Sequence, residues 1–299
     1  MLETPALVAH AANLDIVIRH VLAGLGHGIH AGRERGAGVE FSEYRAYAPG
    51  DEWRRVDWKL LARADRYYVR EAERDSHVAA WLWLDASASM AEPSRAVKDL
   101  DKLWYARTAL ACVAAIAQRQ GDAFGLVVCG GGKAEMIAPA RGPRQLQRVF
   151  AALARTAAGG ALPSDDVLRS TLRSSPHLAH APALVFAAGD CLDWPSPWSQ
   201  ALERLRSMRH DVRLLALSTQ AEIDGSFTSG VAYRDREGDG GLHRLLATDR
   251  AAYRAARAAH LDGVAAACRQ RDIPLTHATI ERPLEGALRA WLRAPGVRR

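Results

Sequence analysis

The fold of this 299-residue chain is decided by one stretch, Ala79-Ala-Trp-Leu-Trp-Leu84, which runs directly into Asp85-Ala-Ser87-Ala-Ser89-Met90. A run of six apolar residues is typical of a strand that is covered on both faces, as in a parallel sheet. The abrupt change to Asp and Ser marks the carboxyl end of that strand, where ligands bind in open α/β sheets. The stretch therefore predicts a fold class and the position of a site within it.

The chain after residue 77 repeats this alternation of short apolar runs and amphipathic segments. Further strands are predicted over 123–129, 183–188 and 212–217. Apolar residues at spacings of three and four predict helices over 103–118, 145–153, 165–172, 199–208, 248–271 and 284–292. Strands that alternate with helices imply an α/β fold, a doubly wound, mostly parallel sheet with helices on both faces. We assign this domain to residues 77–299.

Residues 1–76 differ in texture and are predicted to form a charged and aromatic N-terminal extension. Between residues 31 and 75 the chain carries ten basic and ten acidic side chains, with Tyr and Trp interspersed. Arg pairs with carboxylates and stacks on aromatic rings, so we expect the extension to pack on the core through Trp53, Trp58, Arg45, Arg54 and Asp57. The alternative is a docking surface for a partner, because Arg and aromatic residues are also enriched at interfaces.

The turn after the first apolar strand offers oxygen ligands for a cation. Ser87 and Ser89 follow Asp85 at alternating positions, so both hydroxyl groups can point to the same side as the carboxylate. One carboxylate and two hydroxyls suit a hard divalent ion such as Mg²⁺. A second carboxylate, Asp190, follows the strand 183–188 and is expected at the same edge of the sheet. We predict that these four residues form a metal site; the alternative is that Asp85 and the serines only cap the next helix.

The same residues carry a resemblance to a known site. The motif Asp85-x-Ser87-x-Ser89, with a later strand ending in Gly189-Asp190, resembles the metal-ion-dependent adhesion site of von Willebrand factor A domains. In related adhesion-type domains a Glu or Asp of the partner completes the coordination of the metal. The resemblance therefore implies that an acidic partner residue binds here.

A longer block resembles a family. Residues 35–63, followed by 68–70 and the Asp85 motif, resemble the bacterial "domain of unknown function 58" family over most of the chain. That family typically accompanies MoxR-type AAA+ ATPases. The resemblance implies a von Willebrand A-like module that acts with such an ATPase, or with its client, in a chaperone-like or assembly system.

The sequence departs from the adhesion-site pattern at one position. Such sites usually take a threonine hydroxyl from a Gly-Gly-Thr-like loop, and Ala161 stands at the corresponding place in this chain. Alanine has no ligand atom, so Ser164 or Asp165 substitutes for the threonine or the site is weak. The cofactor that the resemblance implies is Mg²⁺ or Mn²⁺.

Composition argues against several classes of function. The chain has 40 basic and 34 acidic residues, a formal net charge of +6, and 48% hydrophobic residues, which is ordinary for a globular protein. It has no basic run interleaved with aromatics, so we expect no nucleic-acid partner, and no apolar window long enough for an integral membrane segment. The four cysteines form no CxxC pair and the N-terminus lacks a signal-peptide pattern, which favours the cytoplasm.

These features favour a protein-binding and assembly module that is not an enzyme. Phosphotransferases of the Asp-x-Asp type would need a carboxylate at position 87, where this chain has Ser87. The chain also lacks the Gly-x-Ser-x-Gly elbow of hydrolases and the Gly-x-x-x-x-Gly-Lys-Ser/Thr loop of nucleotide-binding proteins. Two alternatives remain: an interaction protein whose metal site is degenerate, and a metal-dependent phosphoesterase.

Overall fold

The computed structural model describes residues 41–46, 67–72, 78–175, 178, 182–234 and 241–293. The chain divides into two compact units, Gly28–His77 and a larger unit that contains Val78–Arg299. In the smaller unit, β1 (Phe41–Ala46) pairs antiparallel with β2 (Tyr68–Ala72). The predicted contacts of this extension, through Trp53, Trp58, Arg45, Arg54 and Asp57, fall on residues or side chains outside the described part of the chain.

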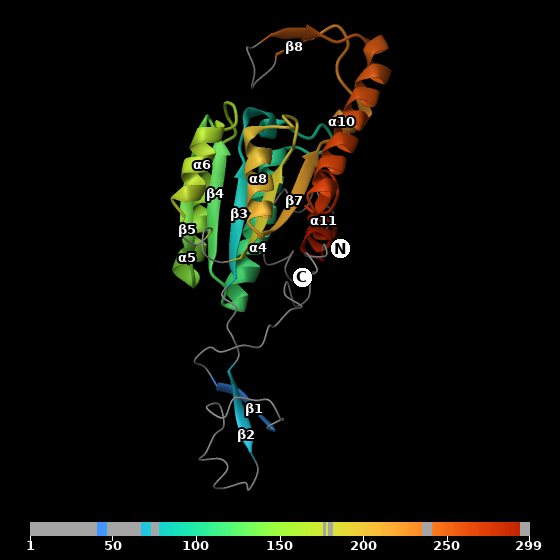
Figure 1. The fold of residues 1–299 in the computed structure, drawn as a ribbon. Helices are drawn as coiled ribbons and strands as arrows, with labels where there is room; N and C mark the ends of the chain where they lie inside the picture. Colours follow the sequence, from blue (N-terminus) through green and yellow to red (C-terminus); the bar gives the residue numbers. More distant parts are fainter. Residues whose placement is uncertain are drawn as a thin grey trace. The chain divides into compact units, whose positions relative to one another are not determined.

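The larger unit is built on one mixed sheet (Figure 1). Its strands are β3 (Ala79–Asp85), β4 (Phe124–Gly130), β5 (Lys133–Ala140), β6 (Ala183–Gly189), β7 (Asp211–Ser218) and β10 (Leu275–Thr279). They lie in the order β10-β7-β6-β3-β4-β5, and only the edge strand β5 runs antiparallel to its neighbour. The prediction of an α/β fold with a mostly parallel sheet is confirmed.

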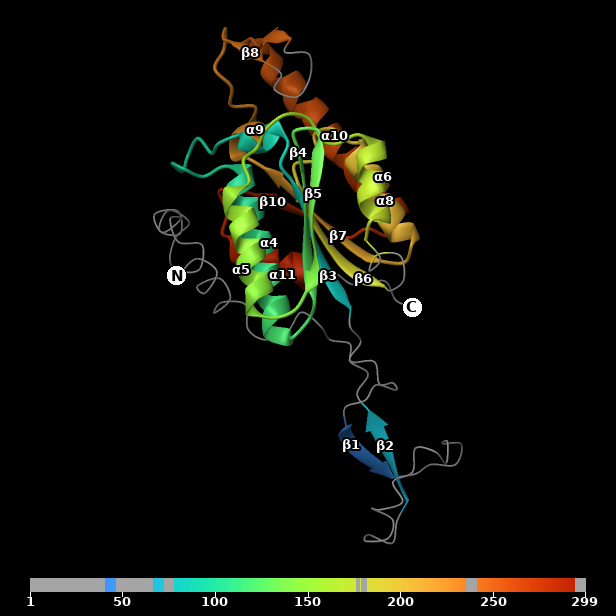
Figure 2. The ribbon, with the colours of Figure 1, turned by 90° about the vertical axis from the view of Figure 1, so that its left-hand side faces the viewer.

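Helices cover both faces of this sheet (Figure 2). One face carries α4 (Lys102–Gln120), α5 (Pro143–Arg155) and α11 (Leu284–Arg293), and the other carries α6 (Asp165–Arg173), α8 (Pro197–Ser207) and α10 (Arg250–Gln270). Shorter elements are the 3₁₀ turns η2 (Ala88–Ala91) and η3 (Ala247–Asp249) and the helix α9 (Gln220–Asp224). No helix in the described part of the chain combines the length and hydrophobicity that a membrane span requires.

Helix α4 is central to the packing and begins at the edge of the sheet that carries the candidate site. Its N-cap Asp101 accepts a hydrogen bond from the Trp104 N–H at 2.6 Å, and Gly121 ends it at a φ of 77°. The positive φ favours glycine, as at many helix C-termini. Thirteen of its 19 residues are buried, so tertiary packing fixes where its first residue, Lys102, lies.

Three tryptophans fill the core beneath the α6–α8 face. Trp81 and Trp83 on β3 and Trp198 on α8 are at most 1% exposed and belong to one apolar cluster. Their indole N–H groups have no hydrogen-bond partner among the residues that the structure describes. A buried donor without a partner costs about 1–3 kcal/mol, which the burial of such large rings outweighs.

A buried histidine joins the starts of two central strands. The Nδ1 atom of His210 accepts a hydrogen bond from the Ala183 N–H at 3.0 Å, and its Nε2 lies 3.0 Å from the Leu178 carbonyl oxygen. A carbonyl oxygen can only accept, so Nε2 carries the proton and the ring is neutral. Burial lowers the pKa of His210, which outweighs the opposing effect of the Leu178 carbonyl.

An arm extends from the larger unit between β7 and β10. It consists of α9, a short hairpin of β8 (Ala232–Arg234) and β9 (Leu242–Arg244), and the N-terminal half of α10, which continues past the sheet (Figure 1). The ring of Phe227 makes edge-to-face contacts with Tyr233 at 6.5 Å and with Tyr253 at 5.9 Å. These aromatic contacts tie the hairpin to the helix.

Candidate functional site

The two predicted carboxylates lie where the strand order of the sheet reverses. The chain passes from β3 outward to β4 and β5, and then returns to the other side of β3 to form β6. Ligands of doubly wound sheets bind at such a switch point, outside the carboxyl ends of the strands. Asp85 ends β3 and Asp190 directly follows β6, and the two strands pair with Leu84 opposite Ala188. The predicted convergence of Asp85 and Asp190 is therefore present.

The Asp85 corner, defined as Asp85, Ser87 and Ser89, is held together by its own hydrogen bonds. The backbone N–H of Ser87 donates to Asp85 Oδ1 at 2.9 Å, and the Ser87 hydroxyl donates to the same oxygen at 2.6 Å. The hydroxyl oxygens of Ser87 and Ser89 are 3.1 Å apart. Asp85 and Ser87 are buried, whereas Ser89 is half-buried. All three predicted residues therefore place oxygen atoms at one small corner.

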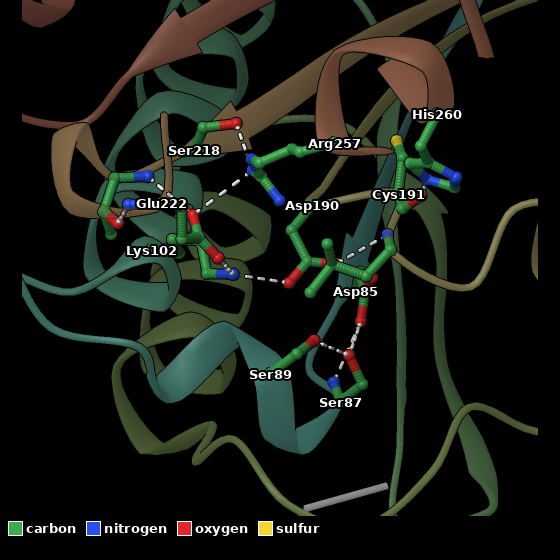
Figure 3. A network of polar contacts seen from close by, with 12 residues as sticks. Asp85, Ser87, Ser89, Lys102, Asp190, Cys191, Ser218, Glu222, Arg257 and His260 are labelled. Carbon is green, nitrogen blue, oxygen red and sulfur yellow. Dashed lines mark hydrogen bonds and ion pairs between the residues drawn. The ribbon is translucent and has the colours of Figure 1, made fainter. Parts of the chain in front are cut away.

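Gly189 provides the room that the Asp85 carboxylate occupies. A Cβ atom at position 189 would lie 2.8 Å from both Cβ and Oδ2 of Asp85, closer than side-chain atoms normally approach. The close approach explains why the strand β6 ends in Gly189 immediately before Asp190. Asp190 follows Gly189 directly, so it emerges at the same end of the paired strands as Asp85 (Figure 3).

Asp190 is bound by a lysine rather than turned toward the serines (Figure 3). Its Oδ2 accepts a hydrogen bond from Lys102 Nζ at 2.6 Å, and its Oδ1 accepts from the Leu192 N–H at 3.2 Å. Lys102 is fully buried and is one of only four lysines in the chain. A cation at the N-terminus of a helix is unfavourable for the helix dipole, so its carboxylate partners are what stabilise it there.

The ammonium group belongs to a larger ion-pair system, the Lys102 network. Lys102 Nζ also lies 3.0 Å from Glu222 Oε1, and Glu222 Oε2 accepts from Arg257 at 3.4 Å. Arg257 in turn donates to the Ser218 hydroxyl at 2.8 Å. Glu222 is fixed by a capping box, in which its carboxylate accepts from the Thr219 N–H at 2.7 Å. The network joins α4, the end of β6, the end of β7, α9 and α10.

Burial and charge together set the protonation of this region. Burial alone would lower the pKa of Lys102, but the charges of Asp190 and Glu222 outweigh it, so the net pKa is raised and the ammonium form persists. Burial, and then the charges of Asp190 and Asp85, raise the pKa of the adjacent Cys191 thiol. Cys191 is therefore a protonated thiol at neutral pH, with neither the nucleophilicity nor the metal affinity of a thiolate.

The third loop of the predicted site lies against the Asp85 corner. The Gly159 N–H donates to the Ala86 carbonyl at 3.0 Å, and the Ala88 N–H donates to the Gly160 carbonyl at 2.9 Å. Ala161 follows in the same loop and is exposed. Of the two proposed substitutes for a threonine, the Asp165 carboxylate is paired with Arg204 and with Arg169. The expectation that Asp165 supplies a ligand is therefore not supported by its contacts.

The oxygen donors of the Asp85 corner fit a hard divalent cation. The Ser87 hydroxyl gives its proton to Asp85, so the Ser89 hydroxyl is the donor in the contact between the two serines. Each hydroxyl oxygen then keeps a lone pair for a cation. Asp190 would act only as an outer, water-mediated ligand, since Lys102 holds it. In the described part of the chain, no three His, Cys, Asp or Glu side chains gather to hold a metal ion. A cation here would thus depend on the hydroxyl groups.

Sequence reasoning missed Lys102, Glu222 and Arg257. The sequence contains weak indications of two of them. Lys102 is a rare lysine in an Arg-rich chain and stands at the start of an apolar helix, and Thr219-x-x-Glu222 has the spacing of a capping box. Neither feature indicates which carboxylate the cation meets. That pairing depends on how the helices pack against the sheet.

Comparisons with known proteins identify relatives of the chain. A family model described as "Protein of unknown function DUF58" matches residues 43–262. Uncharacterised proteins of Mycobacterium tuberculosis and Mycobacterium bovis are each 28% identical over 281 residues, which cover 92% of this chain and 85% of the relative.

Solved structures of similar shape include two bacterial proteins. A conserved hypothetical protein BatB from Bacteroides thetaiotaomicron has a TM-score of 0.45 and 14% identity, over 71% of this chain and 95% of that one. A von Willebrand factor type A protein from Catenulispora acidiphila has a TM-score of 0.37 and 17% identity, over 50% of this chain and 34% of that one.

Proposed function

Since the chain belongs to the family described as "Protein of unknown function DUF58", we propose that it is a protein-binding module without enzymatic activity. Its Asp85 corner binds a divalent cation, Mg²⁺ or Mn²⁺, and an acidic residue of a partner completes the site. The observation that carries this proposal is the cluster of one carboxylate and two hydroxyls at the switch point of the sheet. A cation there keeps a coordination position for a foreign carboxylate.

Charge balance supports a cation-dependent partner. In the Asp85 corner and the Lys102 network, the carboxylates of Asp85, Asp190 and Glu222 face two cations, Lys102 and Arg257. The region therefore has one net negative charge and repels an acidic partner. A divalent cation reverses the sign to one net positive charge, so that an acidic partner is attracted.

The partner that we propose is a MoxR-type AAA+ ATPase or its client, in the cytoplasm. The support for this partner is family membership together with the acidic-ligand chemistry of the corner. The module would present or position a client for the ATPase, and the chain's own residues would bind rather than react.

Calorimetric titration with MgCl₂ or MnCl₂ tests the cation. We expect one binding event for the wild-type chain and none for Asp85→Ala, while Asp262→Ala, which removes an exposed carboxylate on α10, should bind as the wild type does. Partner binding is then measured with a purified MoxR-type ATPase at constant Mg²⁺, so that the ATPase keeps its own metal. Equal binding of wild type and Asp85→Ala would refute the metal-bridged mechanism.

Two observations favour a second candidate, an interaction protein whose corner works without metal. Lys102 already neutralises Asp190, and Ala161 supplies no hydroxyl. In that case Asp85 and Ser87 serve to hold the turn before η2, and a folded chain would give no heat with either cation. Retention of the ATPase by Asp85→Ala in the same experiment would support this second candidate.

A further inference from the structure

A groove lies between α5 and the outer strands β4 and β5 of the sheet. It has a volume of about 870 Å³ and is lined by residues of β4, β5, α5 and the loop 156–159. Ala86, which also lines the groove, stands in the sequence between Asp85 and Ser87, the two buried residues of the Asp85 corner. The groove therefore adjoins the turn that carries the site of the proposed function.

The lining combines an apolar floor with a basic rim. Val128 of β4 and Ile137 of β5 are half-buried and contribute apolar surface, and the buried Leu126 lies beneath them. Lys133, Arg148 and Arg155 also line the groove, as does a single carboxylate, Glu135. Cations thus outnumber acidic groups by three to one around apolar surface.

The rim cations are available to a ligand. Among the residues that the structure describes, no side chain forms an ion pair with Lys133, Arg148 or Arg155. The segment 141–158, which contains α5, has four arginines and no acidic residue. Elsewhere in the same unit arginines pair with carboxylates, as Arg204 does with Asp165. The unpaired charge favours an acidic ligand.

We infer that the groove, here named the basic groove, binds an acidic partner segment that also carries apolar side chains. The carboxylates of the segment pair with Lys133, Arg148 and Arg155, and its apolar side chains cover Val128 and Ile137. The inference rests on the proposed function, because it places the remainder of the segment whose acidic residue reaches the Asp85 corner. Bidentate Arg–carboxylate pairs beside apolar surface would give both register and affinity.

The experiment uses fluorescence anisotropy with three short labelled peptides: one of Glu, Leu and Ser, one with Lys in place of Glu, and one with Ser in place of Leu. The wild-type chain should bind the Glu–Leu peptide, and both other peptides more weakly. In the double variant Arg148→Glu/Arg155→Glu, affinity for the Glu–Leu peptide should fall at least about tenfold, and the Lys peptide should bind better than to the wild type. The matched control is Arg119→Glu/Arg173→Glu, which reverses two exposed arginines that do not line the groove.

Each binding measurement is repeated in Mg²⁺ and in EDTA, and also with the Asp85→Ala variant. These repeats separate the proposed metal bridge at the Asp85 corner from the proposed basic groove. Weaker binding by the groove variant under both conditions supports the basic groove, even if Mg²⁺ has no effect and the proposed metal bridge fails. Binding that depends on Mg²⁺ and Asp85 but is unchanged in the groove variant overturns the groove and leaves the metal bridge intact. Equal binding of the Ser-for-Leu peptide, or equal loss in the control variant, would reveal a general anion surface and also overturn it.

Discussion

Replacing Lys102 by Met should destabilise the fold, and the size of the loss reveals whether water is excluded from the ion pairs of the Lys102 network. Lys102 is fully buried, and its ammonium contacts Asp190 at 2.6 Å and Glu222 at 3.0 Å. Methionine is unbranched and adaptable and fits the same space, so the change removes the charge with little change in packing. Two carboxylates, whose side chains are 3% and 13% exposed, then lose their main counter-ion.

The expected loss is about 3–5 kcal/mol, the usual result of removing one partner from a buried ion pair. The control is Arg169→Met, which breaks the exposed pair between Arg169 and Asp165, where Arg169 is 53% exposed. Exposed pairs contribute about 0–1 kcal/mol. The difference between the two losses in the free energy of unfolding therefore measures the effect of burying the ion pair, because both variants lose one positive charge.

Urea unfolding, monitored by tryptophan fluorescence in EDTA, gives both free energies. A loss below about 1 kcal/mol for Lys102→Met would refute the reasoning, because it would mean that water already solvates Asp190 and Glu222. Repeating the measurement in Mg²⁺ adds a second readout. If a cation can bind beside Asp190, Mg²⁺ should stabilise Lys102→Met more than the wild type, since the variant has lost a competing charge.

Gly189→Ala should destabilise the fold by about 1–3 kcal/mol in urea unfolding, because its Cβ would meet the Asp85 carboxylate at 2.8 Å. The control Gly263→Ala lies on α10, where no atom is within 4 Å of the added Cβ, and it should stabilise the fold by about 0.5–1 kcal/mol. Equal effects of the two substitutions would contradict the crowding argument. Burial lowers the pKa of His210, so the unfolded chain takes up the proton first, and stability should fall as the pH drops below about 6.5, the pKa of an unfolded histidine. His210→Gln should flatten that pH dependence in thermal unfolding, and an unchanged curve would assign it to other groups. The free energy of unfolding of Trp83→Phe should lie within about 1 kcal/mol of the wild-type value, because losing an unpaired N–H offsets the lost packing. A loss of about 3–5 kcal/mol in urea unfolding would mean that the indole N–H has a hydrogen-bond partner.

The four central strands could be predicted from the sequence because each is buried on both faces. Their residues are almost all apolar, as in β3, and no periodicity is needed to find them. The two edge strands were not predicted. β5 alternates between exposed and half-buried residues and contains Pro139, and β10 is short and partly polar. Their strand state depends on the neighbour to which they pair, which a local pattern does not reveal.

The candidate site also contains residues that could be predicted from the sequence and residues that could not. Asp85, Ser87 and Asp190 were predicted because each stands at an abrupt change from apolar to polar residues at a strand end. Lys102 and Arg257 were not predicted, because they reach the site from helices. Their partners are chosen by the rotation and depth of α4 and α10 against the sheet, and these follow from packing rather than from spacing along the chain.

The arm has a consequence for how far this protein can reach. With 21 residues, α10 is about 30 Å long, and its buried side chains, Arg257, Val264 and Cys268, all lie beyond its first turns. The hairpin therefore lies beyond the buried part of α10, next to turns of the helix whose side chains are exposed or half-buried. Removing or adding seven residues ahead of Arg257, about two turns, would shift the tip by about 10 Å while keeping the anchoring face in phase. A change in the length of this one helix would therefore alter the reach of the hairpin and leave the buried anchoring residues of α10 in place.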